Sequence, residues 1–141
     1  MKRLRKVTII CTFGQQWHRP FLHHISSLMQ KIKTVFIVNP ISGTLRPAHK
    51  RKLIERFTDS ELFDYKIIFT ECAGHAVSLA AESVRDGAEL VVAVGGDGTV
   101  NEVGRGLAHT GTVMGIIPCG SGNGLARHLG IPVNPILSFR W

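Results

Sequence analysis

The stretch "VVAVGGDGTVNEV", residues 91–103, decides the fold of this chain. Its apolar start predicts a buried strand, and the glycines around Asp97 predict a tight turn, because glycine permits backbone conformations that other residues avoid. The pattern Thr99-Val-Asn-Glu102 fits a capping box, so we expect a helix N-terminus directly after the turn and a helix over about 100–108. One strand, one turn and one helix make a unit that is typical of α/β proteins.

The same alternation continues on both sides of this stretch. Continuous apolar runs predict further strands, and apolar residues at helical spacing predict helices between them. The predicted strands are 34–39, 65–70, 90–94 and 113–117, and the other predicted helices are 47–57, 74–87 and 124–129. Strands that alternate with helices over short connections pair in parallel through right-handed crossovers. The sequence therefore predicts an open α/β fold with a mainly parallel sheet and helices on both faces.

Length and composition predict one globular domain. The chain has 141 residues, of which 44% are hydrophobic, and this suits a single core. We expect an extension outside the fold at 1–30, one lobe at 31–132 and a truncated tail at 133–141. No apolar run approaches the roughly 18 residues that cross a bilayer, and no small-residue cleavage site follows the basic N-terminus, so we expect a cytoplasmic protein.

The formal net charge of +7 favours anionic partners. Basic residues gather on the predicted helix 47–57 and beside it, at Arg46, Lys50, Arg51, Lys52 and Arg56. We interpret them as a solvated helix face. The alternative is a patch that holds the protein against the inner membrane surface, at about 1 kcal/mol for each basic residue. We expect no nucleic-acid partner, because no aromatic platform or recognised binding module accompanies the charge.

A polar or glycine-rich loop follows each of the four predicted strands. These loops are 39–43, 70–76, 95–102 and 118–127. Ligands of open α/β sheets bind beyond the carboxyl ends of the strands, so we expect the loops to converge on one edge of the sheet. Ordinary turn chemistry explains any one of them, but glycine clusters at several consecutive strand ends predict a shared binding site.

The loop around Asp97 predicts an anion site that contains a carboxylate. Gly95, Gly96 and Gly98 let backbone N–H groups approach a phosphate, and the following helix N-terminus adds partial positive charge. The loop is neither a Walker A nor a dinucleotide motif. A carboxylate beside phosphate is explained by a Mg²⁺ ion between them or by proton transfer from a hydroxyl, and both belong to phosphoryl transfer to an alcohol. Asp97 is therefore the predicted catalytic residue, and its metal and base roles both stay open.

The four loops together resemble a known family, the catalytic domain shared by diacylglycerol kinases, sphingosine kinases and bacterial lipid kinases. The motifs "NPISG", "TECAGHA", "GGDGTVNEV" and "IIPCGSGNGLARHLGIP" lie in that family's order between Lys33 and Pro132. The resemblance implies the N-terminal lobe of a NAD kinase/diacylglycerol kinase-like fold, which binds ATP with Mg²⁺ and transfers the γ-phosphoryl group to a lipid hydroxyl. The residues that the loops and the resemblance together assign to the nucleotide are Asn39, Pro40, Ser42, Gly43, Thr70, Gly95, Gly96, Gly98, Thr99, Asn101, Glu102, Gly120, Ser121 and Asn123.

Two departures limit what the resemblance implies. Gly120-Ser-Gly-Asn-Gly124 lacks the aspartate of the GTxND sequence that many bacterial members carry, so the lipid acceptor is not assigned. Nothing in the sequence corresponds to the second, mainly β domain that supplies much of the lipid site in family members. We therefore expect nucleotide binding with weak or absent kinase activity, and a partner that is either a missing C-terminal lobe or another copy of the chain.

Two other functions compete with a lipid kinase at the membrane surface. One is a NAD kinase-like enzyme, because that family also uses a GGDGT loop; against it, "VNEV" follows the loop here and "PCGSGNGLAR" stands in place of that family's substrate-binding loops. The other is a non-catalytic nucleotide-binding fragment, which the missing acceptor domain favours. Transfer of labelled phosphate from ATP to a lipid, to NAD or to neither acceptor distinguishes the three.

Overall fold

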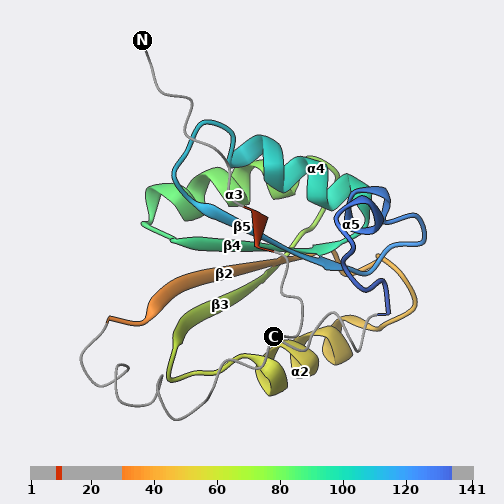
Figure 1. Cartoon of the computed structure of the whole chain (residues 1–141), viewed down its shortest axis with the longest axis horizontal. Helices are drawn as coiled ribbons and strands as arrows, with labels where there is room; N and C mark the ends of the chain where they lie inside the picture. Colours follow the sequence, from red (N-terminus) through yellow and green to blue (C-terminus); the bar gives the residue numbers. More distant parts are fainter. Residues whose placement is uncertain (1–8, 11–29, 135–141) are drawn as a thin grey trace.

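The computed structural model of the chain describes residues 9–10 and 30–134 (Figure 1). The elements in chain order are β1 (Ile9–Ile10), β2 (Ile32–Val38), α2 (Pro47–Phe57), β3 (Phe63–Phe69), α3 (His75–Arg85), β4 (Leu90–Gly95), α4 (Asp97–Gly106), β5 (Val113–Pro118) and α5 (Gly124–His128). All seven elements predicted from the sequence between residues 34 and 117 are present. The short helix predicted near 124 is present as α5.

The five strands form one sheet in the order β1-β5-β4-β2-β3, and all neighbouring strands are parallel. From β2 the chain moves outward to β3, whereas from β4 it moves outward to β5 on the opposite side. The boundary between β2 and β4 is therefore a topological switch point, where the loops leaving the two strands diverge. This topology confirms the predicted open α/β fold with a parallel sheet.

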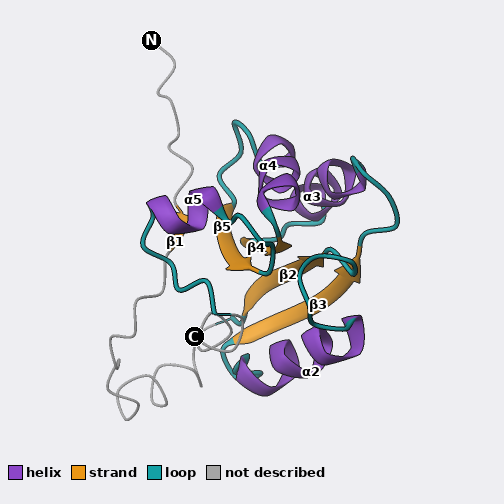
Figure 2. Cartoon of the chain, turned by 90° about the vertical axis from the view of Figure 1, so that its right-hand side faces the viewer, coloured by secondary structure: helices purple, strands orange, loops and turns teal. Residues whose placement is uncertain are grey.

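Helices cover both faces of the sheet (Figure 2). On β2, Val35 and Ile37 pack in the core under α3 and α4, whereas Phe36 and Val38 pack in the core on the side of α2. This alternation follows from the two-residue period of a strand. Because both faces are buried, β4 reads as a continuous apolar run, as the sequence predicts for an internal parallel strand.

The helix that follows the glycine turn begins earlier than predicted. The extended backbone of Gly96 makes it the N-cap residue of α4, so Asp97 is the first helical residue. The predicted capping box is therefore wrong: Thr99 lies inside the first turn of the helix, is 5% exposed and makes no capping hydrogen bond. The physical reason is that two glycines suffice to turn the chain, which frees Glu102 for a different partner.

The predicted domain limits stay a prediction, because most of the extension 1–30 and residues 135–141 of the tail lie outside the described residues. Within the extension, the backbone of Ile9–Ile10 pairs in parallel with Met114 and Gly115 of β5. None of the helices in the described part of the chain has the length and apolarity of a membrane span.

Candidate functional site

Three loops meet where the strands end beside the switch point, and we call loops 39–43, 95–98 and 119–125 together the rim. A Cβ atom added to Gly43 would lie 1.9 Å from the carbonyl oxygen of Cys119. A Cβ atom added to Gly120 would lie 2.6 Å from the Cα of Gly96. The loops therefore touch through their backbones, and only glycine fits at these two contacts. The predicted convergence of these three loops on one edge is confirmed.

Asp97 lies at the start of α4, at the centre of the rim. Its Oδ1 accepts a hydrogen bond from the backbone N–H of Leu125 at 3.4 Å, and a Cβ atom on Gly122 would lie 2.9 Å from its Oδ2. The side chain is otherwise exposed, and a negative group is favourable at a helix N-terminus. The carboxylate therefore faces the last loop and keeps lone pairs available to accept a proton or to bind a cation.

The chemistry of this carboxylate fits Mg²⁺ bound together with a nucleotide. The described residues contain no group of three or more His, Cys, Asp or Glu side chains that could hold a metal ion on their own. Mg²⁺ is usually held by one or two carboxylates together with substrate phosphates and water, so a single exposed carboxylate is sufficient. Asp97 would be its protein ligand, and the bound ion would neutralise phosphate charge.

Asn123 shapes the last loop of the rim. It is 4% exposed and adopts a left-handed backbone conformation at φ 51°. Its Oδ1 accepts a hydrogen bond from the Gly120 N–H at 2.9 Å, and its Nδ2 donates to the Gly120 carbonyl at 2.6 Å. Asn123 thus closes the loop on itself, which leaves the exposed Ser121 at its tip.

Asn39 links the first loop of the rim to α4 across the switch point. Its backbone N–H donates to the Val94 carbonyl at 2.9 Å, and its Nδ2 donates to Thr99 Oγ1 at 3.3 Å. A Cβ atom on Gly95 would lie 2.4 Å from the same Thr99 oxygen, so this glycine makes room for the link. Pro40 and Ser42 follow in the same loop.

Lys50 is a residue of this region that the sequence interpretation missed. The predicted place of Lys50 on a solvated helix face is wrong: the side chain is 0% exposed, and its Nζ donates to oxygens of the loop 39–43. Burial lowers the pKa of Lys50, an effect partly opposed by the Cys119 sulfur, and burial raises the pKa of Cys119 to about 11. The signal was the spacing, because Lys50 precedes the apolar Leu53 and Ile54 by three and four residues and shares their face.

The other predicted site residues lie farther along the same edge. The Thr70 N–H donates to the Val38 carbonyl at 2.9 Å, so Thr70 follows the outer strand β3. Glu102 accepts hydrogen bonds from the N–H groups of Gly74 at 2.9 Å and Ala76 at 3.2 Å, which caps the N-terminus of α3. Both oxygens of Glu102 are therefore engaged by backbone. The two remaining predicted residues, Gly98 and Asn101, are exposed on α4.

An open parallel sheet with glycine loops at its switch point is the architecture of doubly wound ligand-binding lobes. Residues 33–140 match the sequence model of the family described as Diacylglycerol kinase catalytic domain. This match covers well over half of the chain, so the chain belongs to that family.

Individual relatives agree with this membership. The chain is 38% identical over 104 residues to a diacylglycerol kinase of Bacillus subtilis, covering 72% of this chain and 34% of the relative. It is 36% identical over 102 residues to a diacylglycerol kinase of Staphylococcus saprophyticus, covering 70% and 33%. A crystal structure of a diacylglycerol kinase from Bacillus anthracis superposes with a TM-score of 0.67 at 28% identity, covering 79% of this chain and 42% of the other. The chain thus spans about a third of the length of these curated relatives.

Proposed function

We propose that this chain forms the ATP-binding lobe of a lipid kinase, which transfers the γ-phosphoryl group of ATP to a lipid hydroxyl. One observation carries the proposal: three loops touch through glycine backbone around the single exposed carboxylate of Asp97, at the switch point of a parallel sheet. Membership of the diacylglycerol kinase catalytic domain family supports it.

The rim suits a triphosphate because backbone groups can approach it closely. The N-terminus of α4 directs N–H groups and partial positive charge toward the space beside Gly96 and Gly98. The loops 39–43 and 119–125 border that space on either side. Phosphoryl transfer relies mainly on positioning and charge stabilisation, so backbone donors and one carboxylate form a sufficient nucleotide-side machinery.

Asp97 has two chemical roles that fit its position. As a ligand of Mg²⁺ it would join the ion to the ATP phosphates, and as a base it would accept the proton of the lipid hydroxyl. Its carboxylate oxygens make one protein hydrogen bond, at 3.4 Å, which leaves them free for either role. We propose that Glu102 acts differently, as the tie between α4 and α3 rather than as a direct ATP ligand.

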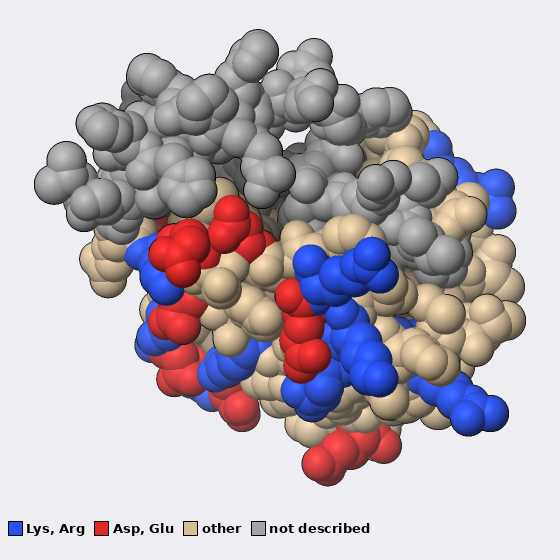
Figure 3. All heavy atoms as spheres, turned by 90° about the horizontal axis from the view of Figure 1, so that it is seen from below, with Lys and Arg blue, Asp and Glu red and all other residues tan. Residues whose placement is uncertain are grey.

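We further propose that the lipid acceptor is held at the inner membrane surface by a further lobe or by another copy of the chain. Basic residues on and beside α2 would support attraction to an anionic leaflet. Those that are exposed are Arg46, Arg51, Lys52 and Arg56. Figure 3 shows Lys and Arg atoms beside Asp and Glu atoms on this side of the molecule, so the attraction would be moderate.

The test is Mg²⁺-dependent ATP binding, followed by transfer of labelled phosphate. We expect the purified chain to bind Mg²⁺-ATP, and Asp97→Asn to weaken that binding about tenfold or more if Asp97 is the metal ligand. Where the unsubstituted chain shows measurable transfer, binding that persists in Asp97→Asn while transfer is lost would instead assign the base role. Diacylglycerol, a sphingoid base and NAD serve as acceptors. Transfer to NAD alone, or no nucleotide binding, would contradict the proposal.

A further inference from the structure

Lys50 is buried beneath the first loop of the rim, and none of the described residues places a carboxylate at its ammonium group. Its Nζ lies 2.7 Å from the Asn39 carbonyl oxygen, 2.7 Å from the Ser42 carbonyl oxygen and 3.0 Å from Ser42 Oγ. The Pro40 carbonyl oxygen lies farther away, at 3.4 Å. All of these oxygens belong to one loop, so one helical side chain gathers most of the loop around a single atom.

The number of contacts matches the chemistry of an ammonium group. A protonated lysine has three N–H donors and no acceptor, and the three shorter contacts use all of them. A neutral amine has two donors and one lone pair, so it would need the Ser42 hydroxyl as a donor, but this hydroxyl already donates to the Asn39 carbonyl at 3.1 Å. Burial of a charge is tolerated only where hydrogen bonds replace water, and the loop carbonyls supply that replacement.

This contact also fixes which way the loop peptides face. A peptide unit is planar, with its C=O and N–H on opposite sides. The Ser42 carbonyl points at Lys50, so the N–H of Gly43 points away from Lys50. Gly43 has φ +64° and lies against the Cys119 carbonyl, which holds the loop from its other side. The loop is thereby clamped between α2 and the last loop of the rim.

We propose that Lys50 is a positioning residue, which orders the loop 39–43 and presents its backbone donors to the phosphates of the nucleotide. The inference rests on the proposed ATP-binding function but assigns Lys50 no contact with the nucleotide. The fixed positive charge behind the loop also favours an anion in front of it. Lys52, two residues along the same helix, is exposed and has no such role.

The test compares Lys50→Met, which keeps the length of the side chain and removes the charge, with Lys52→Met as the matched control. Backbone order parameters of Ser42 and Gly43 from ¹⁵N relaxation report the loop without any nucleotide. We expect them to fall from about 0.85 to about 0.6 or lower in Lys50→Met and to be unchanged in Lys52→Met. Unchanged order parameters in Lys50→Met would overturn the proposal.

Nucleotide affinity supplies the second readout. We expect Lys50→Met to weaken ATP binding about tenfold and adenosine binding less than twofold, because the proposal places this loop against the phosphates. Equal losses for ATP and adenosine, or no loss for either, would overturn the positioning role. If the unmodified chain binds no ATP, the proposed function fails, while the order parameters still decide what Lys50 does.

Ser42→Ala repeats the test if Lys50→Met does not fold. It removes the Oγ acceptor at 3.0 Å, together with the hydrogen bond that Ser42 Oγ donates to the Asn39 carbonyl at 3.1 Å, and it leaves the two carbonyl acceptors of Lys50 in place. We expect a smaller drop in the order parameter of Gly43 and about a threefold loss of ATP affinity. A Ser42→Ala variant with full loop order and full affinity would overturn the proposal.

Discussion

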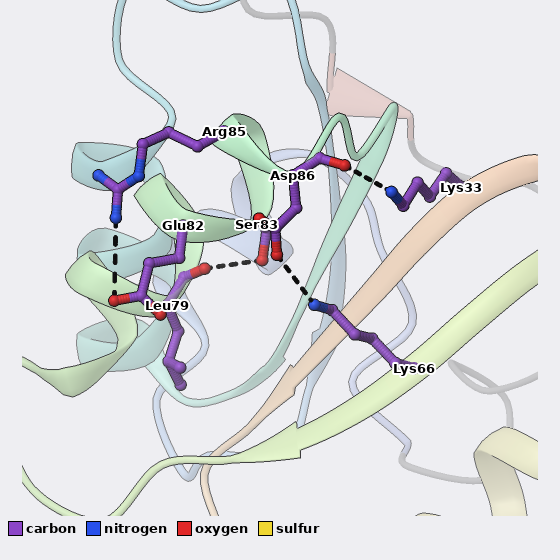
Figure 4. A network of polar contacts seen from close by, with 7 residues as sticks. All are labelled: Lys33, Lys66, Leu79, Glu82, Ser83, Arg85 and Asp86. Carbon is purple, nitrogen blue, oxygen red and sulfur yellow. Dashed lines mark hydrogen bonds and ion pairs between the residues drawn. The ribbon is translucent and has the colours of Figure 1, made fainter.

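The two edges of the sheet handle charge in different ways. At the amino edge, an open groove of about 270 Å³ is lined by Lys33, Asp64, Lys66 and Asp86, among others. There the Lys66 Nζ lies 3.4 Å from Asp86 Oδ2, and Lys33 donates to the Asp86 carbonyl (Figure 4). At the carboxyl edge, Lys50 is held by neutral carbonyl oxygens, and Asp97 has no ion-pair partner among the described residues.

The difference shows why the groove at the amino edge is not the better candidate site. At the amino edge the charges of Lys66 and Asp86 form an ion pair, and exposed pairs of this kind contribute little energy. The carboxyl edge instead leaves a carboxylate and a helix N-terminus facing solvent, with their supporting residues buried. Unneutralised groups held by a rigid frame are what binding and catalysis require. The predictions below test this contrast.

Substitution of Gly43 gives the largest expected effect. Gly43→Ala would place a methyl group 1.9 Å from a backbone carbonyl at φ +64°, and neither can move cheaply. We expect the free energy of unfolding to fall by about 3 kcal/mol, from overlap and left-handed strain together. Gly87, near the amino edge, has φ +82° and nothing within 4 Å, so Gly87→Ala should cost only about 1 kcal/mol. The free energies of unfolding are measured by urea denaturation. Equal losses in Gly43→Ala and Gly87→Ala would contradict the proposed difference between the two edges.

Glu102 should have an intermediate effect. Glu102→Ala removes the acceptor of two backbone N–H groups at the N-terminus of α3. We expect the free energy of unfolding to fall by about 1–2 kcal/mol, as for loss of a helix cap. Glu55→Ala, an exposed substitution on α2, is the matched control and should change it by less than about 0.5 kcal/mol. Loss of ATP affinity without loss of stability would show that Glu102 contacts the nucleotide instead.

The ion pair at the amino edge should matter least. Asp86→Asn breaks a pair whose side chains are 49% and 59% exposed. We expect a change below about 0.5 kcal/mol in the free energy of unfolding and no change in ATP affinity. A tenfold drop in ATP affinity with Asp86→Asn would place the nucleotide site at the amino edge of the sheet and contradict the proposed site at the carboxyl edge.

The fold could be predicted from sequence because the apolar runs and the helical spacing both report burial directly. Pro47 at the start of α2 and the run at β4 define these elements without tertiary information. The convergence of the loops followed from parallel pairing alone. Which residues contact a nucleotide stays a prediction.

Two features could not be predicted from the sequence, because they depend on contacts between residues that are distant along the chain. The Thr99-to-Glu102 spacing fits a local capping box, yet Glu102 caps the N-terminus of α3, and no local pattern distinguishes the two. Charge alone groups Lys50 with its basic neighbours, although its spacing places it on the apolar face of the helix, where it is buried. The burial of Lys50 is tolerated because carbonyl oxygens of the loop 39–43 replace water as hydrogen-bond acceptors, and the sequence alone does not show this contact.

The most direct test of the central claim is to map Mg²⁺-ATP on the chain by backbone amide chemical shifts. The account predicts saturable shifts at the rim, at Ser42, Gly96, Gly98 and Ser121, with the amino edge unaffected. No shift with any nucleoside triphosphate, with or without Mg²⁺, or shifts confined to the surroundings of Lys33 and Lys66, would contradict it.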